Sequence, residues 1–219
     1  LTDNGYDWSY GYGGKIGVQA DFGPGFSFGA AYQSQMYMTE LDKYAGLFAG
    51  GGEFNIPATA QAGFGWDSGV GVKIALDYKR IFYGDVDAIS NAFLPNLMTA
   101  QLGDADGAGF GWETINIYKL GIEWEATPTI AIRGGAALND NPIPDSEVMF
   151  NILAPGVQEQ HYTAGLTWKV SPNSAVNFGF MYSPKSSVTG ANQLEAPDQQ
   201  TITIEMWQWE STVGWTWTF

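Results

Sequence analysis

The chain has 219 residues, with 29 glycines, no cysteine and a formal net charge of −14. The absence of cysteine excludes disulfides, thiolate zinc sites and iron–sulfur ligation, and the acidity excludes nucleic acid, which requires clustered positive charge. An apolar content of 45% is too high for a disordered chain. No uncharged apolar stretch is long enough for a membrane-spanning helix.

Apolar residues alternate with polar or small residues in nine segments, and a period of two predicts β-strands. The segments are roughly 10–22, 26–38, 58–66, 70–83, 115–126, 129–138, 159–170, 174–184 and 202–219. Residues 88–98 are the one short helix that we expect. The sequence therefore predicts an all-β fold.

Two kinds of connection alternate along the chain. Short connections with turn-forming residues follow the segments that end near 22, 66, 126 and 170. Long connections span about 39–57, 84–114, 139–158 and 185–201. Short turns at one end of a sheet and long loops at the other are typical of a transmembrane β-barrel.

Charge falls on one face of the predicted strands. In residues 70–78 one face reads Val, Val, Ile, Leu, Tyr and the other reads Gly, Lys, Ala, Asp. Arg80, near a strand end, is the one charge in phase with the apolar face of the strands. Six of the nine basic residues share the opposite face: Lys15, Lys73, Lys79, Lys119, Arg133 and Lys169. A charge at the bilayer midplane costs roughly 2–4 kcal/mol, so this segregation predicts a lipid-facing surface.

Aromatic residues flank the apolar face at both ends, as in the aromatic girdles of membrane barrels. Those next to short turns or the C-terminus are Phe22, Phe26, Trp66, Trp124, Trp168 and Trp217, and those nearer the long loops are Tyr10, Tyr32, Tyr78, Phe82, Tyr118 and Tyr182. The chain closes on an alternating strand with Phe219, which resembles the C-terminal signal of bacterial outer-membrane barrels.

The strand count indicates a partial barrel. Nine antiparallel strands would close with two parallel neighbours, whereas single-chain bacterial barrels have even numbers of strands. The chain also opens at Leu1 rather than at a methionine. We therefore expect a processed chain or a part of a larger protein, with residues 1–219 forming the C-terminal portion of one barrel domain.

The segment 139–157, from Asn139-Asp140-Asn141-Pro142 to Pro155-Gly156-Val157, followed by His161, resembles the long-chain fatty acid transporter (FadL) family of outer-membrane proteins. Supporting matches are Phe54-Asn55-Ile56-Pro57-Ala58, Asp77-Tyr78 with 81–86, Tyr118-Lys119-Leu120-Gly121, Ser187-Val188-Thr189-Gly190 and the closing strand. The resemblance spans essentially the whole chain.

The resemblance implies a 14-stranded antiparallel barrel, of which about nine strands are present, with the N-terminal hatch and the early strands outside this chain. It implies a porin-like channel in the outer membrane of a Gram-negative bacterium. Long-chain fatty acids or other hydrophobic compounds would enter by passive diffusion through a lumenal pocket. The expected partners are the hydrophobic ligand, outer-membrane lipid and lipopolysaccharide. We expect a monomer with no cofactor and no metal.

A fatty acid needs an apolar slot for its tail and a cation for its carboxylate. Lys119 and Arg133, on neighbouring predicted strands, are the first candidate cations, and Lys73 and Lys79 come next. The alternative is that these residues pair with Asp77, Glu123 or Glu125 as ordinary lumenal charges. The apolar loop residues Met149, Phe150, Ile152 and Leu153 are candidates for a surface capture site, with packing of the loop as their alternative.

His161 is the only histidine, and it falls on the predicted lumenal face. A barrel hydrolase would need a serine, histidine and acid set. Thr163 and Ser171 are weak partners for that chemistry, so we expect no enzyme and no catalytic residue. An outer-membrane lipid-modifying enzyme and a soluble β-barrel with an apolar interior are the alternatives from other functional classes.

Overall fold

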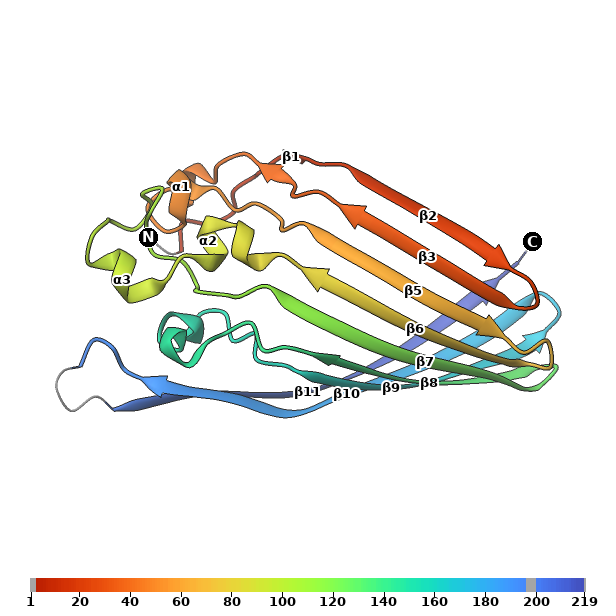
Figure 1. Ribbon diagram of the computed structural model, residues 1–219. Coiled ribbons are helices and arrows are strands. Elements are labelled where there is room, and N and C mark those ends of the chain that lie inside the picture. Colours follow the sequence, from red (N-terminus) through yellow and green to blue (C-terminus); the bar gives the residue numbers. More distant parts are fainter. Residues whose placement is uncertain (1–2, 196–199, 219) are drawn as a thin grey trace.

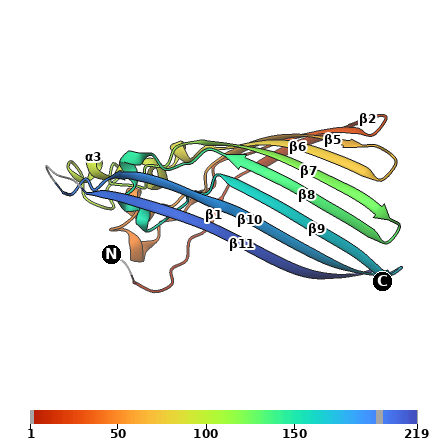
Figure 2. The same cartoon turned by 90° about the horizontal axis from the view of Figure 1, so that it is seen from below.

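The computed structural model describes residues 3–195 and 200–218 of the chain. Within them, nine strands form one antiparallel sheet, curved into an open trough (Figures 1 and 2). Neighbours in the sheet are neighbours in the chain, apart from short strands outside it. The strands are β2 (Lys15–Phe22), β3 (Phe26–Gln33), β5 (Thr59–Asp67), β6 (Val72–Ile81), β7 (Ile115–Thr127), β8 (Ile130–Asn139), β9 (Gln160–Ser171), β10 (Ser174–Ala191) and β11 (Thr201–Trp217).

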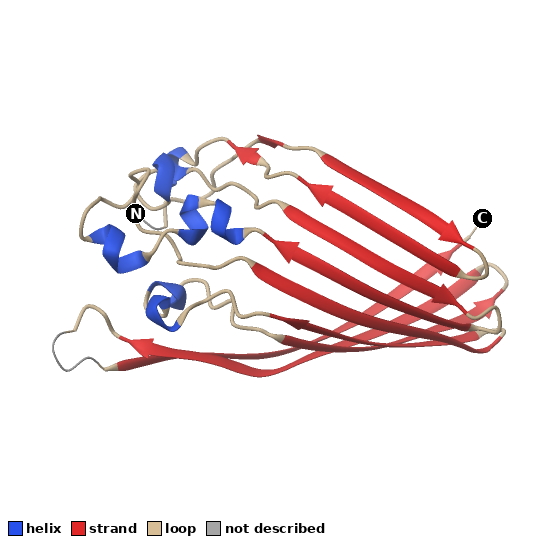
Figure 3. Cartoon of the chain, in the orientation of Figure 1, coloured by secondary structure: helices blue, strands red, loops and turns tan. Residues whose placement is uncertain are grey.

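The sheet has a turn end and a loop end, and we use these names below. Short turns at 23–25, 68–71, 128–129 and 172–173 make the turn end. The loop end carries all the helices drawn in Figure 3. Its elements are β1 (Gly11–Tyr12), β4 (Tyr37–Met38), η1 (Asp42–Tyr44), α1 (Ala49–Gly52), η2 (Tyr83–Asp85), α2 (Asp87–Ser90), α3 (Phe93–Leu97), η3 (Asp145–Glu147) and η4 (Phe150–Ile152).

The predicted all-β class, the nine sheet strands and the alternation of turns and loops are confirmed. Three of the expected elements are interrupted in the structure. The segments 10–22 and 26–38 each break, and their outer pieces pair separately as β1 and β4. The expected helix at 88–98 is two short helices, because Asn91 and Ala92 leave helical geometry between α2 and α3.

The predicted loop 185–201 is shorter in the structure, since β10 continues to Ala191 and β11 begins at Thr201. A β-bulge explains why the alternation did not predict this continuation. Ser183 pairs with Gln208 and Ser186 with Met206, so Pro184 and Lys185 together face one residue. A bulge tolerates a proline, which lacks an N–H, and shifts the alternation by one residue.

The outer face of the sheet is apolar and exposed, as the alternation predicted. Leu76, Ile122 and Phe180, at the middle of three strands, are each about half exposed. The predicted aromatic girdles also pack laterally. Phe26 contacts Trp66 near the turn end with ring centroids 6.3 Å apart, and Tyr78 contacts Tyr118 near the loop end at 5.4 Å. Phe219, assigned to this face from the sequence, lies outside the described residues.

The buried apolar side chains lie away from the outer face of the sheet. Twelve hydrophobic residues are buried within the described ranges, all in loops or near the loop ends of strands: Ala49, Ala58, Val86, Ala88, Ile89, Phe93, Ala108, Ile115, Ile143, Val148, Val157 and Ile204. A sheet in water would bury its apolar face, whereas a sheet in a bilayer places that face against lipid. None of the described helices is long and apolar enough to cross a membrane.

A charge on the outer face should therefore destabilise the protein, while the same charge on the inner face should not. Leu76 and Ala75 are adjacent mid-strand residues of β6 on opposite faces. We expect Leu76→Arg to lower the free energy of unfolding from lipid vesicles by roughly 2–4 kcal/mol relative to Ala75→Arg. Denaturant titration of the full-length protein measures this difference, and equal losses in the two variants would contradict the lipid-facing assignment.

Candidate functional site

A groove of about 890 Å³ runs across the inner face of the sheet from β3 to β10. Its floor is a row of small residues that lie directly opposite one another on successive strands: Ser27, Gly65, Ala75, Gly121, Gly135 and Thr163. Because these side chains are short, the inner surface is hollowed along this row. Rows of polar residues border the floor on both sides.

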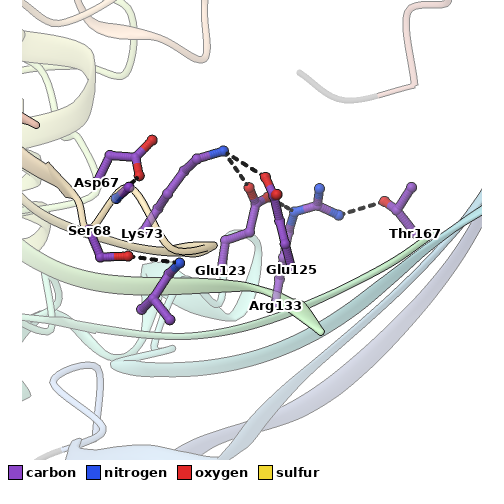
Figure 4. Close-up of polar contacts among 9 residues, drawn as sticks. Asp67, Ser68, Lys73, Glu123, Glu125, Arg133 and Thr167 are labelled. Atoms are coloured by element: carbon purple, nitrogen blue, oxygen red, sulfur yellow. Dashed lines mark hydrogen bonds and ion pairs between the residues drawn. The ribbon is translucent and has the colours of Figure 1, made fainter. Parts of the chain in front are cut away.

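The border on the turn-end side is a continuous polar network, which we call the turn-end ladder (Figure 4). Lys73 Nζ lies 3.1 Å from Glu123 Oε1 and 3.3 Å from Glu125 Oε1. Arg133 Nε lies 2.6 Å from Glu123 Oε2, and its Nη1 donates to Thr167 Oγ1 at 2.7 Å. The two cations and two carboxylates of the ladder compensate each other in charge.

The ladder continues across the next strands without further charges. Thr167 Oγ1 donates to Asn177 Oδ1 at 2.7 Å, and Asn177 Nδ2 donates to Thr216 Oγ1 at 3.1 Å. The network therefore joins inner-face side chains of β6 through β11. Such a network holds each polar group in one direction, and the two cations in it are already paired with carboxylates.

The border on the loop-end side is the row that contains Gly63, Asp77, Lys119, Ala137 and His161. Lys119 lines the groove and forms no ion pair with any described residue, and the same holds for Lys79, which lines the adjoining hollow of about 710 Å³. Of the four candidate cations, Lys73 and Arg133 thus pair within the ladder, which was the stated alternative, while Lys119 and Lys79 do not.

Lys119 and Arg133 lie on adjacent strands, as expected from the sequence, but at different levels of the groove. Lys119 faces Ala137 on β8, whereas Arg133 faces Glu123 on β7. The row of small residues that forms the floor lies between the row of Lys119 and the row of Arg133. The groove therefore offers one cation on its loop-end border and a neutralised pair of cations on its turn-end border.

His161 lies at the end of the same row as Lys119 and lines the groove. Thr163 lies on the floor of the groove, whereas Ser171 lies at the turn end of β9. The described residues include no hydrogen bond that joins His161 to either hydroxyl. The arrangement therefore lacks the contacts of a nucleophile and its base.

At the loop end, Glu147 and Asn151 join the connection 140–159 to the connection 82–114, and we call this pair the loop clasp. Glu147 is 6% exposed, and its Oε2 accepts the N–H of Phe93 at 2.8 Å. Asn151 is fully buried; it donates to the Phe110 carbonyl at 2.6 Å and accepts from Trp112 Nε1 at 2.6 Å. Both polar side chains are satisfied across two loops, as buried polar groups require.

Gly111 makes room for the clasp. Its φ of +68° favours glycine, and a methyl group at this position would lie 2.3 Å from Glu147 Cγ. Sequence reasoning missed both members of the clasp, although they lie in the block that carried the family resemblance. The available signal was their spacing of four residues around the apolar run 148–150.

The four apolar loop candidates divide into packed and exposed residues. Phe150 stacks between Phe93 and Phe110, with both centroid distances at 4.9 Å, so its ring packs the two loops together. Ile152 and Leu153 are 59% and 64% exposed, and Met149 is partly buried. An exposed apolar pair on an extramembrane loop suits contact with a hydrophobic molecule.

Comparison with known proteins agrees with this geometry. Residues 1–218 match the family described as outer membrane protein transport protein (OMPP1/FadL/TodX). A search of curated proteins gave no match. Among solved structures, the chain is similar to the Pseudomonas putida toluene transporter TodX, with a TM-score of 0.64, 16% identity, and coverage of 100% of this chain and 51% of that one.

Two further structures show the same fold. A Pseudomonas aeruginosa FadL homologue has a TM-score of 0.61 at 13% identity, covering 94% of this chain and 52% of its own. The monoaromatic hydrocarbon channel CymD has a TM-score of 0.56 at 17% identity, covering 96% and 52%. The chain spans about half the length of these structures.

The sheet is curved and antiparallel, with an exposed apolar outer face, a hollowed inner face and long loops at one end. These features are typical of an outer-membrane β-barrel transport protein. The chain belongs to the OMPP1/FadL/TodX family, and its sheet matches half of the 14-stranded barrel of that family. The family resemblance, the fold class and the outer-membrane localisation expected from the sequence are confirmed. The family consists of transporters, so the enzyme and soluble-barrel alternatives are wrong.

The loop clasp should make the loop end sensitive to pH. Burial raises the pKa of Glu147, against the opposing effect of its hydrogen bonds from Phe93 and Ser146. A carboxyl whose folded pKa is raised binds more protons when folded, so its contribution to stability is present at acid pH and is lost as pH rises from 4.5 through the folded pKa.

Protection of the Phe93 amide against hydrogen exchange, corrected for the intrinsic rate, should therefore fall over this pH window in the wild type. We expect Glu147→Gln, which cannot ionise, to remove this fall. Glu113→Gln, at an exposed glutamate of the same loop region, is the matched control and should keep it. A pH profile unchanged in Glu147→Gln would show that another group controls the loop.

Proposed function

We propose that the chain forms the C-terminal nine strands of a 14-stranded outer-membrane channel, which admits long-chain fatty acids or other hydrophobic compounds by passive diffusion. Residues 1–219 are then the C-terminal part of one barrel domain, and the remaining strands and an N-terminal hatch lie outside them. The channel acts as a monomer in a membrane of lipid and lipopolysaccharide.

The direction of the edge strands supports the partial barrel. The nine strands are antiparallel in sequence order, so the two edges, β2 and β11, run in the same direction. Direct closure would pair them in parallel, whereas an odd number of intervening strands restores antiparallel pairing and an even total, as in single-chain bacterial barrels. The coverage of about half of the TodX and CymD structures agrees with this count.

Cysteine cross-linking tests this proposal, because the chain has no native cysteine. We expect no intramolecular disulfide in full-length protein that carries Val18→Cys on β2 and Val213→Cys on β11, since disulfides need Cα atoms within roughly 7 Å. Ala30→Cys replaces Val213→Cys in the control, because Ala30 faces Val18 directly. Equal cross-linking in both pairs would show that the sheet closes on itself.

The substrate proposal rests on Lys119, whose ammonium lies on the border of an inner groove with a small-residue floor and forms no ion pair within residues 3–195 and 200–218. A cation without a partner in a hollowed surface attracts a carboxylate, and a charge-assisted hydrogen bond is about twice as strong as a neutral one. Toluene and monoaromatic hydrocarbons, named for two of the similar structures, carry no charge. Lys119 therefore favours a fatty acid over a hydrocarbon as the ligand of this chain.

Lys79, Lys73 and Arg133 have different parts in this proposal. Lys79 lies closer to the loop end, where it meets an incoming carboxylate before Lys119 does. Lys73 and Arg133 hold Glu123 and Glu125, so that these two carboxylates of the turn-end ladder do not face the ligand unpaired. The exposed pair Ile152 and Leu153, supported by Met149 and Phe150, offers the first apolar contact outside the membrane.

Replacing Lys119 should separate charged from uncharged ligands. We expect Lys119→Ala to weaken binding of palmitate about tenfold, the effect of one lost charge-assisted hydrogen bond, and to leave binding of hexadecane unchanged. Competition with a fluorescent fatty acid on the full-length protein in detergent measures both affinities. Lys169→Ala, at an inner-face lysine outside the groove, controls for net charge. Equal weakening for both ligands would refute the role of Lys119 as the carboxylate anchor.

A further inference from the structure

Four pairs of oppositely charged residues lie directly opposite one another on the inner face of the described strands, and two of them, Asp77 with Lys119 and Asp67 with Lys73, form no ion pair. Lys73 faces Glu123 and Glu123 faces Arg133, and both contacts close, at 3.1 and 2.6 Å. Asp77 faces Lys119 in the same way, yet these two form no ion pair in the described structure. Unlike charges directly opposite each other on antiparallel strands normally attract.

The position of the Asp77 carboxylate explains the difference. On its other side, Asp77 faces Gly63 of β5. A methyl group built on Gly63 would lie 2.0 Å from Asp77 Oδ1 and 3.2 Å from Asp77 Cγ. The carboxylate thus occupies the space that any other side chain at position 63 would fill. Because β5 and β7 flank β6 on opposite sides, this carboxylate points away from Lys119.

The Lys73–Glu123 pair, which forms an ion pair, has a different neighbour on β5. The residue that faces Lys73 on β5 is Asp67, which forms no ion pair with Lys73 in the described structure; its Oδ1 accepts the N–H of Gly69 at 2.9 Å. Lys73 instead reaches the two glutamates of β7. The two rows share the same strands but differ on β5, with Asp67 in one and Gly63 in the other, and on β8, with Arg133 in one and Ala137 in the other. On β5 the glycine gives the Asp77 carboxylate room on the side away from Lys119.

We propose that Gly63 is a specificity-determining residue of the groove: it seats the Asp77 carboxylate over β5 and thereby leaves Lys119 free to bind a ligand carboxylate. The inference rests on the proposed function, in which Lys119 is the anion anchor. Gly63 itself does not touch the ligand; it acts through Asp77 as a positioning residue. A side chain at 63 would move Asp77 toward Lys119 and neutralise the anchor.

Gly63→Ala tests this mechanism with a single methyl group. The atom that must move is the end of a flexible side chain, so the variant should fold normally. We expect palmitate to bind about tenfold more weakly to Gly63→Ala than to the wild type, and hexadecanol, which has the same tail without the charge, to bind equally. Gly134→Ala is the matched control, because that glycine lies on the outer face with nothing within 4 Å of the added methyl group.

The double variant Gly63→Ala/Asp77→Asn separates charge from shape. An asparagine moved toward Lys119 does not neutralise it, so palmitate affinity should return to the wild-type value although the methyl group remains. Equal weakening for palmitate and hexadecanol in Gly63→Ala, or no recovery in the double variant, would show that the methyl group only narrows the groove. An unchanged palmitate affinity in Gly63→Ala would also overturn the proposal.

Lys119→Ala in the same assay distinguishes this proposal from the function on which it rests. If Lys119→Ala loses palmitate selectivity and Gly63→Ala keeps it, the role of Gly63 is overturned and the anchor stands. If the wild type itself binds palmitate no better than Lys119→Ala does, the anchor and the role of Gly63 are both overturned.

Discussion

The cost of placing a charge in hydrocarbon is the constraint on which this structure depends. It admits no charged residue to the middle of the outer face, so the charges of the membrane-spanning strands gather on the inner face. Arg80 illustrates the limit, since it lies on the outer face only near a strand end, with its guanidinium 5.5 Å from the Phe82 ring. A sheet that must collect its charges on one side necessarily has a polar inner face.

The charged residues on the inner face form two groups with different roles. In the turn-end ladder, Lys73, Glu123 and Arg133 satisfy one another and continue through hydroxyl and amide groups to β11. On the other side of the small-residue floor, Asp77 and Lys119 face each other but form no ion pair in the described structure. The ladder stabilises the inner surface of the wall, while the open row keeps a cation available beside the groove. Small residues are therefore as important to the site as charged ones.

The period-two pattern was enough to predict the all-β class, the nine strands and the face on which each charge lies, because alternation is a local property of the chain. Which charges pair is not local: the contacts of Glu123 with both Lys73 and Arg133 depend on the register of three strands. The continuation of β10 was hidden because the bulge at Pro184 and Lys185 shifts the alternation. The loop clasp was missed because Glu147 and Asn151 are polar loop residues whose burial depends on contacts with the distant connection 82–114, and their spacing around the apolar run 148–150 is a weak local signal.

The core of the loop end has a consequence for the order in which the molecule is assembled. Ile143, Val148 and Val157 bury their side chains against Ile204, which belongs to β11, and β10 approaches the same loop so closely that a methyl group on Gly190 would overlap the Asp145 carbonyl. The connection 140–159 precedes β10 and β11 in the chain, and its residues Ile143, Val148 and Val157 complete their burial only when both strands have paired. The hairpin of β10 and β11 thus adds two strands to the sheet and fastens the loop-end cap in one step, which couples the pairing of these strands to the ordering of the cap.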